Sequence, residues 1–315
     1  MTIDTRAETN METTTTGTGT AGGNGGTERL VPLPDGGHLC TESFGDPAHR
    51  PLLLISGLSA SMDWWDAGFC RALATGGRLV IRYDHRDTGA SRTDPPGEPS
   101  YTGRDMAEDV LRVLDAYDAD RAHLAGVSAG GGIAQTVALE WPERVASLSL
   151  LSTSPAVPLA PGRSVEDAGL PTSSPEIEEL FGNPPPDPDW NDADAVTDHL
   201  VEQERIFAGA GFDEGWTRRI ARQVVARSVD PASSGNHWNL TDGDPLAAGR
   251  TLADLRTPTV VLHGDADPFF RPEHGEALAE AVPDARFVPL EGVGHQFPPP
   301  AAWGVVVAEI LRVTG

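Results

Sequence analysis

The chain has 315 residues, 39% of them hydrophobic, and its 47 acidic residues outweigh 23 basic ones to give a formal net charge of −24. That length fits one large domain or a domain with an insertion, and no apolar run reaches the ~18 residues of a transmembrane helix. Because every basic residue is arginine and acidic residues dominate, nucleic acid and anionic membrane surfaces are excluded as partners.

The N-terminal segment, residues 1–27, is predicted to be a disordered tail, with Met11 as a second candidate for the initiating residue. The tail is rich in Thr, Gly and Asn, and it lacks the basic and apolar regions of a signal peptide. Cys40 and Cys70 stand in no metal-ligand spacing, so we expect two reduced thiols, with a disulfide as the alternative. These features together predict a cytoplasmic protein.

Strands and helices are predicted to alternate along the chain. The expected strands are 30–33, 38–44, 51–55, 78–84, 121–127, 145–151, 259–263 and 286–290. The expected helices between and after them are 61–74, 101–117, 130–140, 273–281 and 302–313. This alternation predicts an α/β fold with a mostly parallel eight-stranded sheet, helices on both faces, and an antiparallel edge formed by the first two strands.

The alternation stops after the sixth strand and resumes at the seventh. Two stretches of the intervening segment are expected to be helical: 193–208 and 213–228. We predict that residues 153–256 form a helical cap above the carboxyl ends of the strands, where open α/β sheets bind ligands. The α/β core then comprises 28–152 and 257–315; a separate small domain with no part in the site is the alternative.

Aromatic side chains are concentrated in this insertion. Ligand pockets are mostly lined by apolar and aromatic groups. We therefore expect Phe181, Trp216 and Trp238 to line a substrate pocket.

The chemistry centres on the pentapeptide Gly126-Val127-Ser128-Ala129-Gly130, which lies between a predicted strand and a predicted helix. A chain that turns this sharply needs glycines beside the serine and leaves its hydroxyl exposed as a candidate nucleophile. The alternative is a turn of small residues that only packs a helix against the sheet. If the turn is catalytic, the oxyanion donors should be the N–H of Ala129 and that of Leu58, in the loop after the third strand.

A serine nucleophile needs a base, and the base needs an orienting acid. His295 follows the last predicted strand, and Asp265 and Asp267 follow the strand before it. The order Ser, Asp, His is the one expected for a serine in such a turn. The residues alone leave Asp265 and Asp267 both open, Asp265 being able to cap its turn instead.

The segment Asp84-His85-Arg86-Asp87-Thr88-Gly89 is dense in charge. We interpret it as an internally bonded loop in which Arg86 pairs with Asp84 or Asp87, a substrate contact through His85 or Arg86 being the alternative. The sequence has no dinucleotide fingerprint, phosphate-binding loop or metal-ligand cluster, so no cofactor and no metal are predicted.

Together these motifs resemble the α/β-hydrolase superfamily, and the segment from Asp84 to Gly89 is most similar to the aclacinomycin methylesterase group of actinobacterial hydrolases. The resemblance implies Ser128 as nucleophile, His295 as base and Asp267 as its partner, with Leu58 and Ala129 as oxyanion donors.

The resemblance also implies a serine hydrolase that cleaves a small-molecule carboxylic ester, such as a polyketide methyl ester, through an acyl-enzyme. The alternatives are a C–C hydrolase, thioesterase, lactonase or cofactor-free perhydrolase with the same three residues. A ligand-binding or cyclase member without hydrolytic activity is the alternative of another class.

Overall fold

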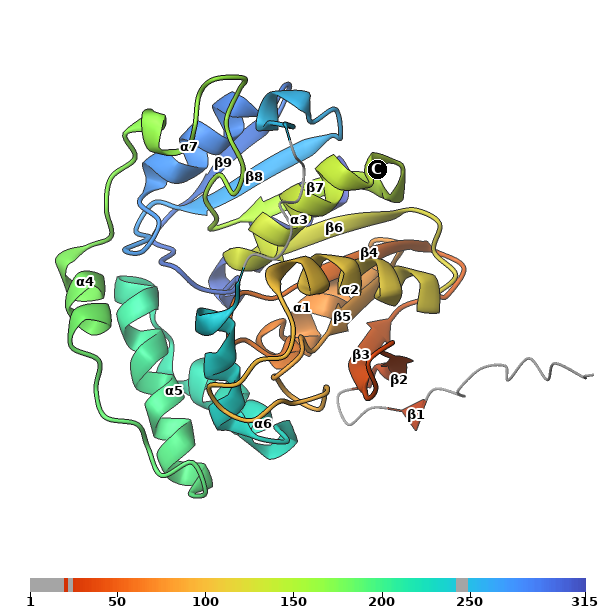
Figure 1. Ribbon diagram of the computed structural model, residues 1–315. Coiled ribbons are helices and arrows are strands. Elements are labelled where there is room, and N and C mark those ends of the chain that lie inside the picture. Colours follow the sequence, from red (N-terminus) through yellow and green to blue (C-terminus); the bar gives the residue numbers. More distant parts are fainter. Residues whose placement is uncertain (1–19, 22–24, 242–248) are drawn as a thin grey trace, which may run out of the picture.

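The computed structural model describes residues 20–21, 25–241 and 249–315, which form one twisted sheet covered by helices (Figure 1). The strands are β1 (Thr20–Ala21), β2 (Thr27–Pro32), β3 (His38–Phe44), β4 (Arg50–Ile55), β5 (Arg78–Tyr83), β6 (Ala122–Val127), β7 (Val145–Leu151), β8 (Thr259–Gly264) and β9 (Arg286–Leu290). Their order across the sheet is β1-β2-β3-β5-β4-β6-β7-β8-β9.

The strands β4 to β9 run parallel, while β1, β2 and β3 form an antiparallel edge. The predicted eight-stranded, mostly parallel sheet is therefore confirmed for β2 to β9, and β1 adds a ninth strand of two residues. The strand β1 lies within residues 1–27, which were predicted to form a disordered tail, and Thr20–Ala21 pairs with the edge of β2. The last residue of the predicted tail, Thr27, is the first residue of β2. Residues 1–19 and 22–24 of the predicted tail lie outside the described residues.

The α-helices are α1 (Ala67–Thr75), α2 (Gly103–Ala116), α3 (Ala129–Glu140), α4 (Pro175–Gly182), α5 (Ala193–Ala208), α6 (Glu214–Arg227), α7 (Pro272–Ala281) and α8 (Trp303–Val313). One apolar core packs α2, α3 and α7 on one sheet face, and a second packs α1 and α8 on the other. All six residues of β6 are buried, as expected for a central strand covered on both faces.

The predicted helix at 61–74 is wrong in one respect, since the structure divides it into a 3-10 turn, η1 (Met62–Trp64), and α1. Asp66 causes the division because its carboxylate accepts a hydrogen bond from the Gly68 N–H at 2.6 Å and caps a new helix. The start of α2 follows the same rule. Thr102 and Asp105 bond each other's backbone N–H groups in a capping box.

The segment between β7 and β8, which we call the cap segment, carries α4, α5, α6 and a nine-residue 3-10 helix, η5 (Pro231–Asn239). Figure 1 shows α4, α5 and α6 grouped at one end of the sheet. Arg227 at the end of α6 joins this group to the core, because its guanidinium pairs with the buried carboxylates of Asp63 and Asp84. The helices α4 and η5 are not among the predicted elements, because they are short and rich in proline, glycine and polar residues.

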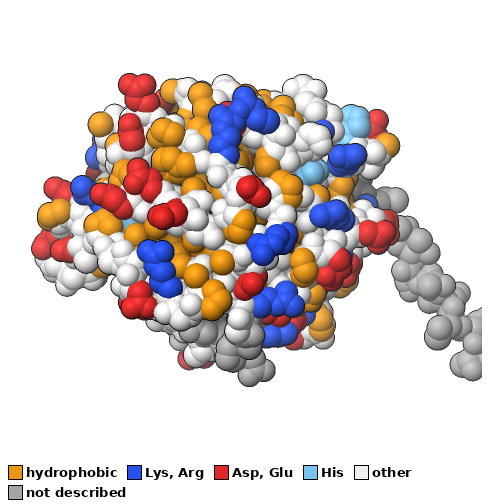
Figure 2. Space-filling view, turned by 90° about the horizontal axis from the view of Figure 1, so that it is seen from above, with side chains coloured by type: hydrophobic (Ala, Val, Ile, Leu, Met, Phe, Trp, Pro, Cys, Tyr) orange, Lys and Arg blue, Asp and Glu red, His pale blue; other side chains and the backbone are white. Residues whose placement is uncertain are grey.

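The surface shown in Figure 2 carries arginine and acidic side chains that are interspersed rather than gathered into patches of one sign. Among the residues described, no helix combines the length and the apolar character needed to cross a bilayer.

The turn between β6 and α3 leaves no room for a side chain at Gly130. A Cβ atom on Gly130 would lie 2.3 Å from the Ile55 carbonyl oxygen, whereas one on the exposed Gly304 in α8 would meet nothing within 4 Å. We expect Gly130→Ala to lower the free energy of unfolding by about 1–3 kcal/mol. Gly304→Ala should raise it by up to about 1 kcal/mol. Urea denaturation of both variants tests this, and a Gly130→Ala protein as stable as wild type would contradict it.

Candidate active site

Ser128 occupies the turn between β6 and α3 with φ 53° and ψ −125°, a left-handed conformation that is strained for a residue with a side chain. Such strain costs about 1–3 kcal/mol and persists only where the surroundings enforce it. Here a Cβ on Gly126 would lie 2.2 Å from the Gly130 carbonyl oxygen. The backbone before the serine and the backbone after it therefore approach each other more closely than any residue with a side chain would permit. The Ser128 hydroxyl faces a cavity.

The structure brings Ser128, His295 and Asp267 together although they lie on three different loops. His295 Nε2 is 3.0 Å from the Ser128 Oγ, and His295 Nδ1 is 2.8 Å from Asp267 Oδ2. Asp267 is buried, and its second oxygen accepts the N–H groups of Phe269 and Phe270, both at 2.9 Å. The carboxylate is thus fixed by the backbone and holds the imidazole, whose other nitrogen faces the hydroxyl.

The second acid left open by the sequence, Asp265, lies elsewhere. It is exposed, and its Oδ1 accepts a hydrogen bond from the Gly292 N–H at 2.7 Å. Asp265 therefore caps the turn that precedes His295, while Asp267 contacts the imidazole.

Leu58 and Ala129 both line the same cavity as Ser128. A Cβ on Gly57 would lie 3.3 Å from the Ser128 Cβ, so the loop after β4 packs directly against the serine. Ala129 is the first residue of α3, and the first N–H groups of a helix have no acceptor within it. Within the described parts of the chain, neither of these two N–H groups is bonded to a protein acceptor. Both are free to bind a ligand oxygen.

The cavity has a volume of about 870 Å³ and is lined by the strand-end loops together with the cap segment. Of the three aromatic residues predicted to line it, Phe181 and Trp238 do so, with ring centroids 5.4 Å apart. The prediction is wrong for Trp216, which lies in the core on the same face of α6 as Ile220 and Val224. Its indole N–H donates to Asp66 at 3.1 Å, so the ring anchors α6 to the core instead of meeting a ligand.

Three phenylalanine rings that the sequence analysis did not select surround His295. Their centroids lie 4.9 Å (Phe269), 5.4 Å (Phe270) and 5.9 Å (Phe207) from that of the imidazole. Phe269 and Phe270 follow Asp267 and Pro268 directly, a proximity that could have identified them. Phe207 comes from α5, and its carbonyl accepts the His295 N–H at 2.8 Å.

The charged loop after β5 is internally bonded, as interpreted from the sequence: the Ala90 N–H donates to the Asp84 carboxylate and the Thr88 hydroxyl donates to the His85 carbonyl, both at 2.9 Å. The interpretation is wrong only for the partner of its arginine. Arg86 pairs with Asp109 in α2 and with Asp35, not with Asp84 or Asp87. The reason is topological, since Asp109 lies on the buried face of α2 and reaches the guanidinium with both oxygens.

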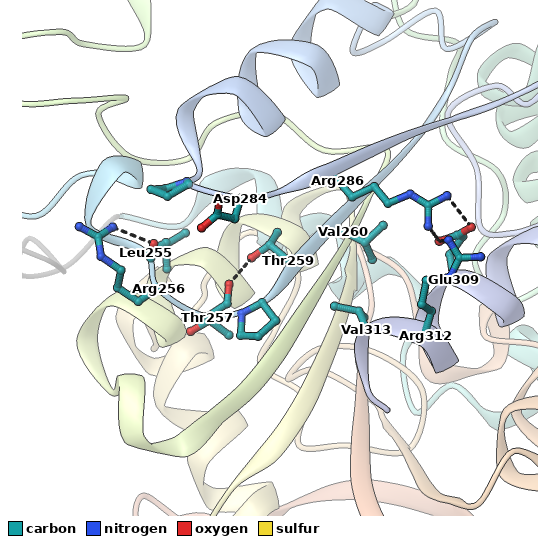
Figure 3. Close-up of a pocket in the computed structure, with 12 residues that line it drawn as sticks. Leu255, Arg256, Thr257, Thr259, Val260, Asp284, Arg286, Glu309, Arg312 and Val313 are labelled. Atoms are coloured by element: carbon teal, nitrogen blue, oxygen red, sulfur yellow. Dashed lines mark hydrogen bonds and ion pairs between the residues drawn. The ribbon is translucent and has the colours of Figure 1, made fainter.

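A second pocket, of about 380 Å³, lies where β8 begins, at the opposite end of that strand from Asp267 (Figure 3). Its walls include Arg286, which pairs with Glu309 of α8. No serine, cysteine or histidine belongs to its described lining. Of these two pockets, the larger one contains the serine that is bonded to a histidine.

A parallel sheet with a serine in a strained strand-to-helix turn, bonded to a histidine held by an aspartate on later loops, defines a protein of the hydrolase class. Residues 50–298 match the family model described as alpha/beta hydrolase fold. The chain belongs to this family.

Relatives with a stated activity support the same assignment. The chain is 34% identical over 276 residues to rhodomycin D methylesterase DauP of Streptomyces sp. (strain C5), covering 82% of this chain and 89% of the relative. It is 33% identical, with the same coverage, to rhodomycin D methylesterase DnrP of Streptomyces peucetius. Among solved structures, a hydrolase from Pseudomonas aeruginosa PA01 superposes with a TM-score of 0.67 and 26% identity, covering 91% of this chain and 98% of the other.

Two buried histidines near the cavity predict how stability depends on pH. Burial lowers the pKa of His85 and of His237 from the ordinary 6.5 to about 4. As pH falls from 6.5 towards 4, the unfolded chain therefore binds protons at these positions while the folded chain does not. The free energy of unfolding should decrease by about 1 kcal/mol per pH unit for each histidine.

Denaturation at a series of pH values tests this expectation. A His237→Asn protein should lose less stability than wild type across the same range, because one of the two linked groups is gone. Parallel curves for the two proteins would contradict it.

Proposed function

We propose that this protein is a serine esterase in which Ser128 is the nucleophile, His295 the general base and Asp267 the group that orients the base. The observation that carries the proposal is the unbroken hydrogen-bond chain from the Asp267 carboxylate through the imidazole to the Ser128 hydroxyl. A serine hydroxyl is a weak nucleophile near neutral pH and reacts when such a base removes its proton.

The reaction follows from the placement of these groups. Ser128 Oγ attacks the ester carbonyl while His295 Nε2 takes its proton, and the N–H groups of Leu58 and Ala129 stabilise the oxyanion. The imidazolium then protonates the departing alcohol, leaving an acyl-serine. Water deprotonated by the same nitrogen attacks the acyl-serine. Collapse of the second oxyanion releases the acid, and the imidazolium returns its proton to Ser128 Oγ.

We propose a methyl ester on a polycyclic, polyketide-derived acid as the substrate. Two relatives that align over 82% of this chain are named methylesterases of rhodomycin D. The cavity of about 870 Å³ and its aromatic walls, Phe181, Phe207 and Trp238 among them, suit a large flat ring system.

A fluorophosphonate probe tests the nucleophile. We expect wild type to be labelled and Ser128→Ala to be unlabelled, with ester hydrolysis lowered by about 10⁴-fold or more because the attacking oxygen is gone. Ser149→Ala in β7 is the matched control, since this buried serine is not part of the described cavity lining and its hydroxyl has no partner among the described residues. Equal labelling of Ser128→Ala and wild type would refute the proposal.

The same proteins separate the ester reaction from its alternatives. Wild type should hydrolyse methyl esters of polycyclic aromatic acids faster than acyl thioesters, lactones or β-diketones of similar size. A preference for the thioester or for carbon–carbon cleavage would retain the nucleophile but overturn the proposed bond.

The two neighbouring acids provide a test of orientation. In Asp267→Asn, the amide would present a donor to His295 Nδ1 and favour the tautomer whose Nε2 carries the proton and cannot accept one from Ser128. We expect kcat to fall by about 10⁴-fold. Asp265→Asn keeps an oxygen for the Gly292 N–H and should leave kcat near the wild-type value. Steady-state kinetics compares them, and similar kcat values for the two variants would count against the assignment.

A further inference from the structure

In the loop after β4, a free N–H lies between two peptide units that are each bonded to a protein group. The free group is that of Leu58, proposed above as an oxyanion donor. The carbonyl of the same peptide unit, that of Gly57, accepts the Ala60 N–H at 3.4 Å, so the unit is fixed from its oxygen side only. The direction of the Leu58 N–H therefore depends strongly on the peptide units that flank it.

Each flanking peptide unit is held by a buried imidazole. His85 Nε2 donates to the Ser56 carbonyl at 3.0 Å, and the Ser59 N–H donates to His237 Nδ1 at 2.8 Å. His85 belongs to the core, whereas His237 belongs to η5 of the cap segment. The two rings lie 5.8 Å apart, nearly perpendicular to one another.

The hydrogen bonds of His237 define its tautomer. Nδ1 accepts from a backbone N–H and so carries no proton, while Nε2 donates to the Arg86 carbonyl at 2.8 Å. The side chain is 3% exposed, and its burial lowers the pKa to about 4, which keeps the ring neutral at pH 7. A neutral ring with one acceptor and one donor satisfies both backbone groups.

Ser59, the residue after Leu58, is itself strained and is held by the same 3-10 helix. Its φ of 59° lies in the left-handed region, which residues with side chains seldom occupy. Its hydroxyl donates to the Ser234 carbonyl at 2.8 Å and accepts the Trp238 indole N–H at 3.1 Å. Three contacts from η5 thus hold Ser59 in this conformation.

We infer that His237 is a positioning residue for catalysis: through the Ser59 N–H it holds the oxyanion loop so that the Leu58 N–H points at the reacting carbonyl. This inference rests on the proposed esterase function and adds a part of the machinery contributed by the cap segment. The cap segment then has two roles, since it both encloses the substrate and completes the oxyanion site.

Two substitutions separate the two hydrogen bonds of His237. In His237→Asn, the amide oxygen takes the place of Nδ1 and retains an acceptor for the Ser59 N–H, but the donor to Arg86 is lost. In His237→Gln, the amide nitrogen takes the place of Nε2 and retains the Arg86 bond, but the acceptor for Ser59 is lost. Each variant loses one buried hydrogen bond, so their losses of stability should be similar.

Their kinetics should differ. We expect His237→Gln to lower kcat by about 10- to 100-fold, less than the 10²–10³ for outright loss of an oxyanion donor. Its KM should change little, because the oxyanion forms in the transition state. His237→Asn should keep kcat within about three-fold of wild type, since the positioning bond is retained.

Controls separate this inference from the proposed function. His123→Gln removes the 2.8 Å contact between His123 Nδ1 and the Ser147 hydroxyl, at the far end of β6 from Ser128, and should leave kcat unchanged. If Ser128→Ala retains full activity, the esterase proposal fails. If Ser128→Ala is inactive and the two His237 variants have equal kcat, only the positioning role is overturned. Thermal unfolding of all variants shows that folded proteins are being compared.

Discussion

The close approach of three backbones around Ser128 is the constraint on which the rest of the site depends. A Cβ on Gly130 would lie 2.3 Å from the Ile55 carbonyl oxygen, so β4, β6 and the start of α3 meet without room for a side chain. This contact holds Ser128 at a positive φ and brings the loop after β4 against it. The strained backbone conformation of Ser128 persists because the rigid elements around it leave no alternative.

The cap segment is joined to the loops that carry His295 and Leu58. The end of α5 accepts the His295 N–H, and η5 holds Ser59 through its backbone and its hydroxyl. Arg227 of α6 pairs with Asp63 and Asp84, both buried. Removing one partner from such a buried cluster leaves an uncompensated charge, which is strongly destabilising. The shape of the cavity and the positions of His295 and Ser59 are therefore coupled through the cap segment.

The parts of the fold that could be predicted are those with a local signal. Strand periodicity and helix amphipathicity located eight strands and most core helices. Each of these elements buries one face, and the apolar residues of that face recur at a regular spacing along the sequence. The split between η1 and α1 was missed because a single carboxylate, that of Asp66, competes for the helix N-terminus. The helix α4 and η5 were missed because short segments rich in proline and polar residues carry little periodicity.

The sequence by itself determined the class of fold, the strained serine turn, and a serine and a histidine that could form a proton-transfer chain with one of two aspartates, since these depend on local pattern and chain order. The tertiary structure placed Asp267, the acid that the family resemblance implied, against the imidazole, and it alone removed Trp216 from the pocket and revealed the bond between His237 and Ser59. These outcomes depend on which side of a helix or loop faces which neighbour. That is decided by the packing of segments up to 178 residues apart in the chain, for which the local sequence carries no signal.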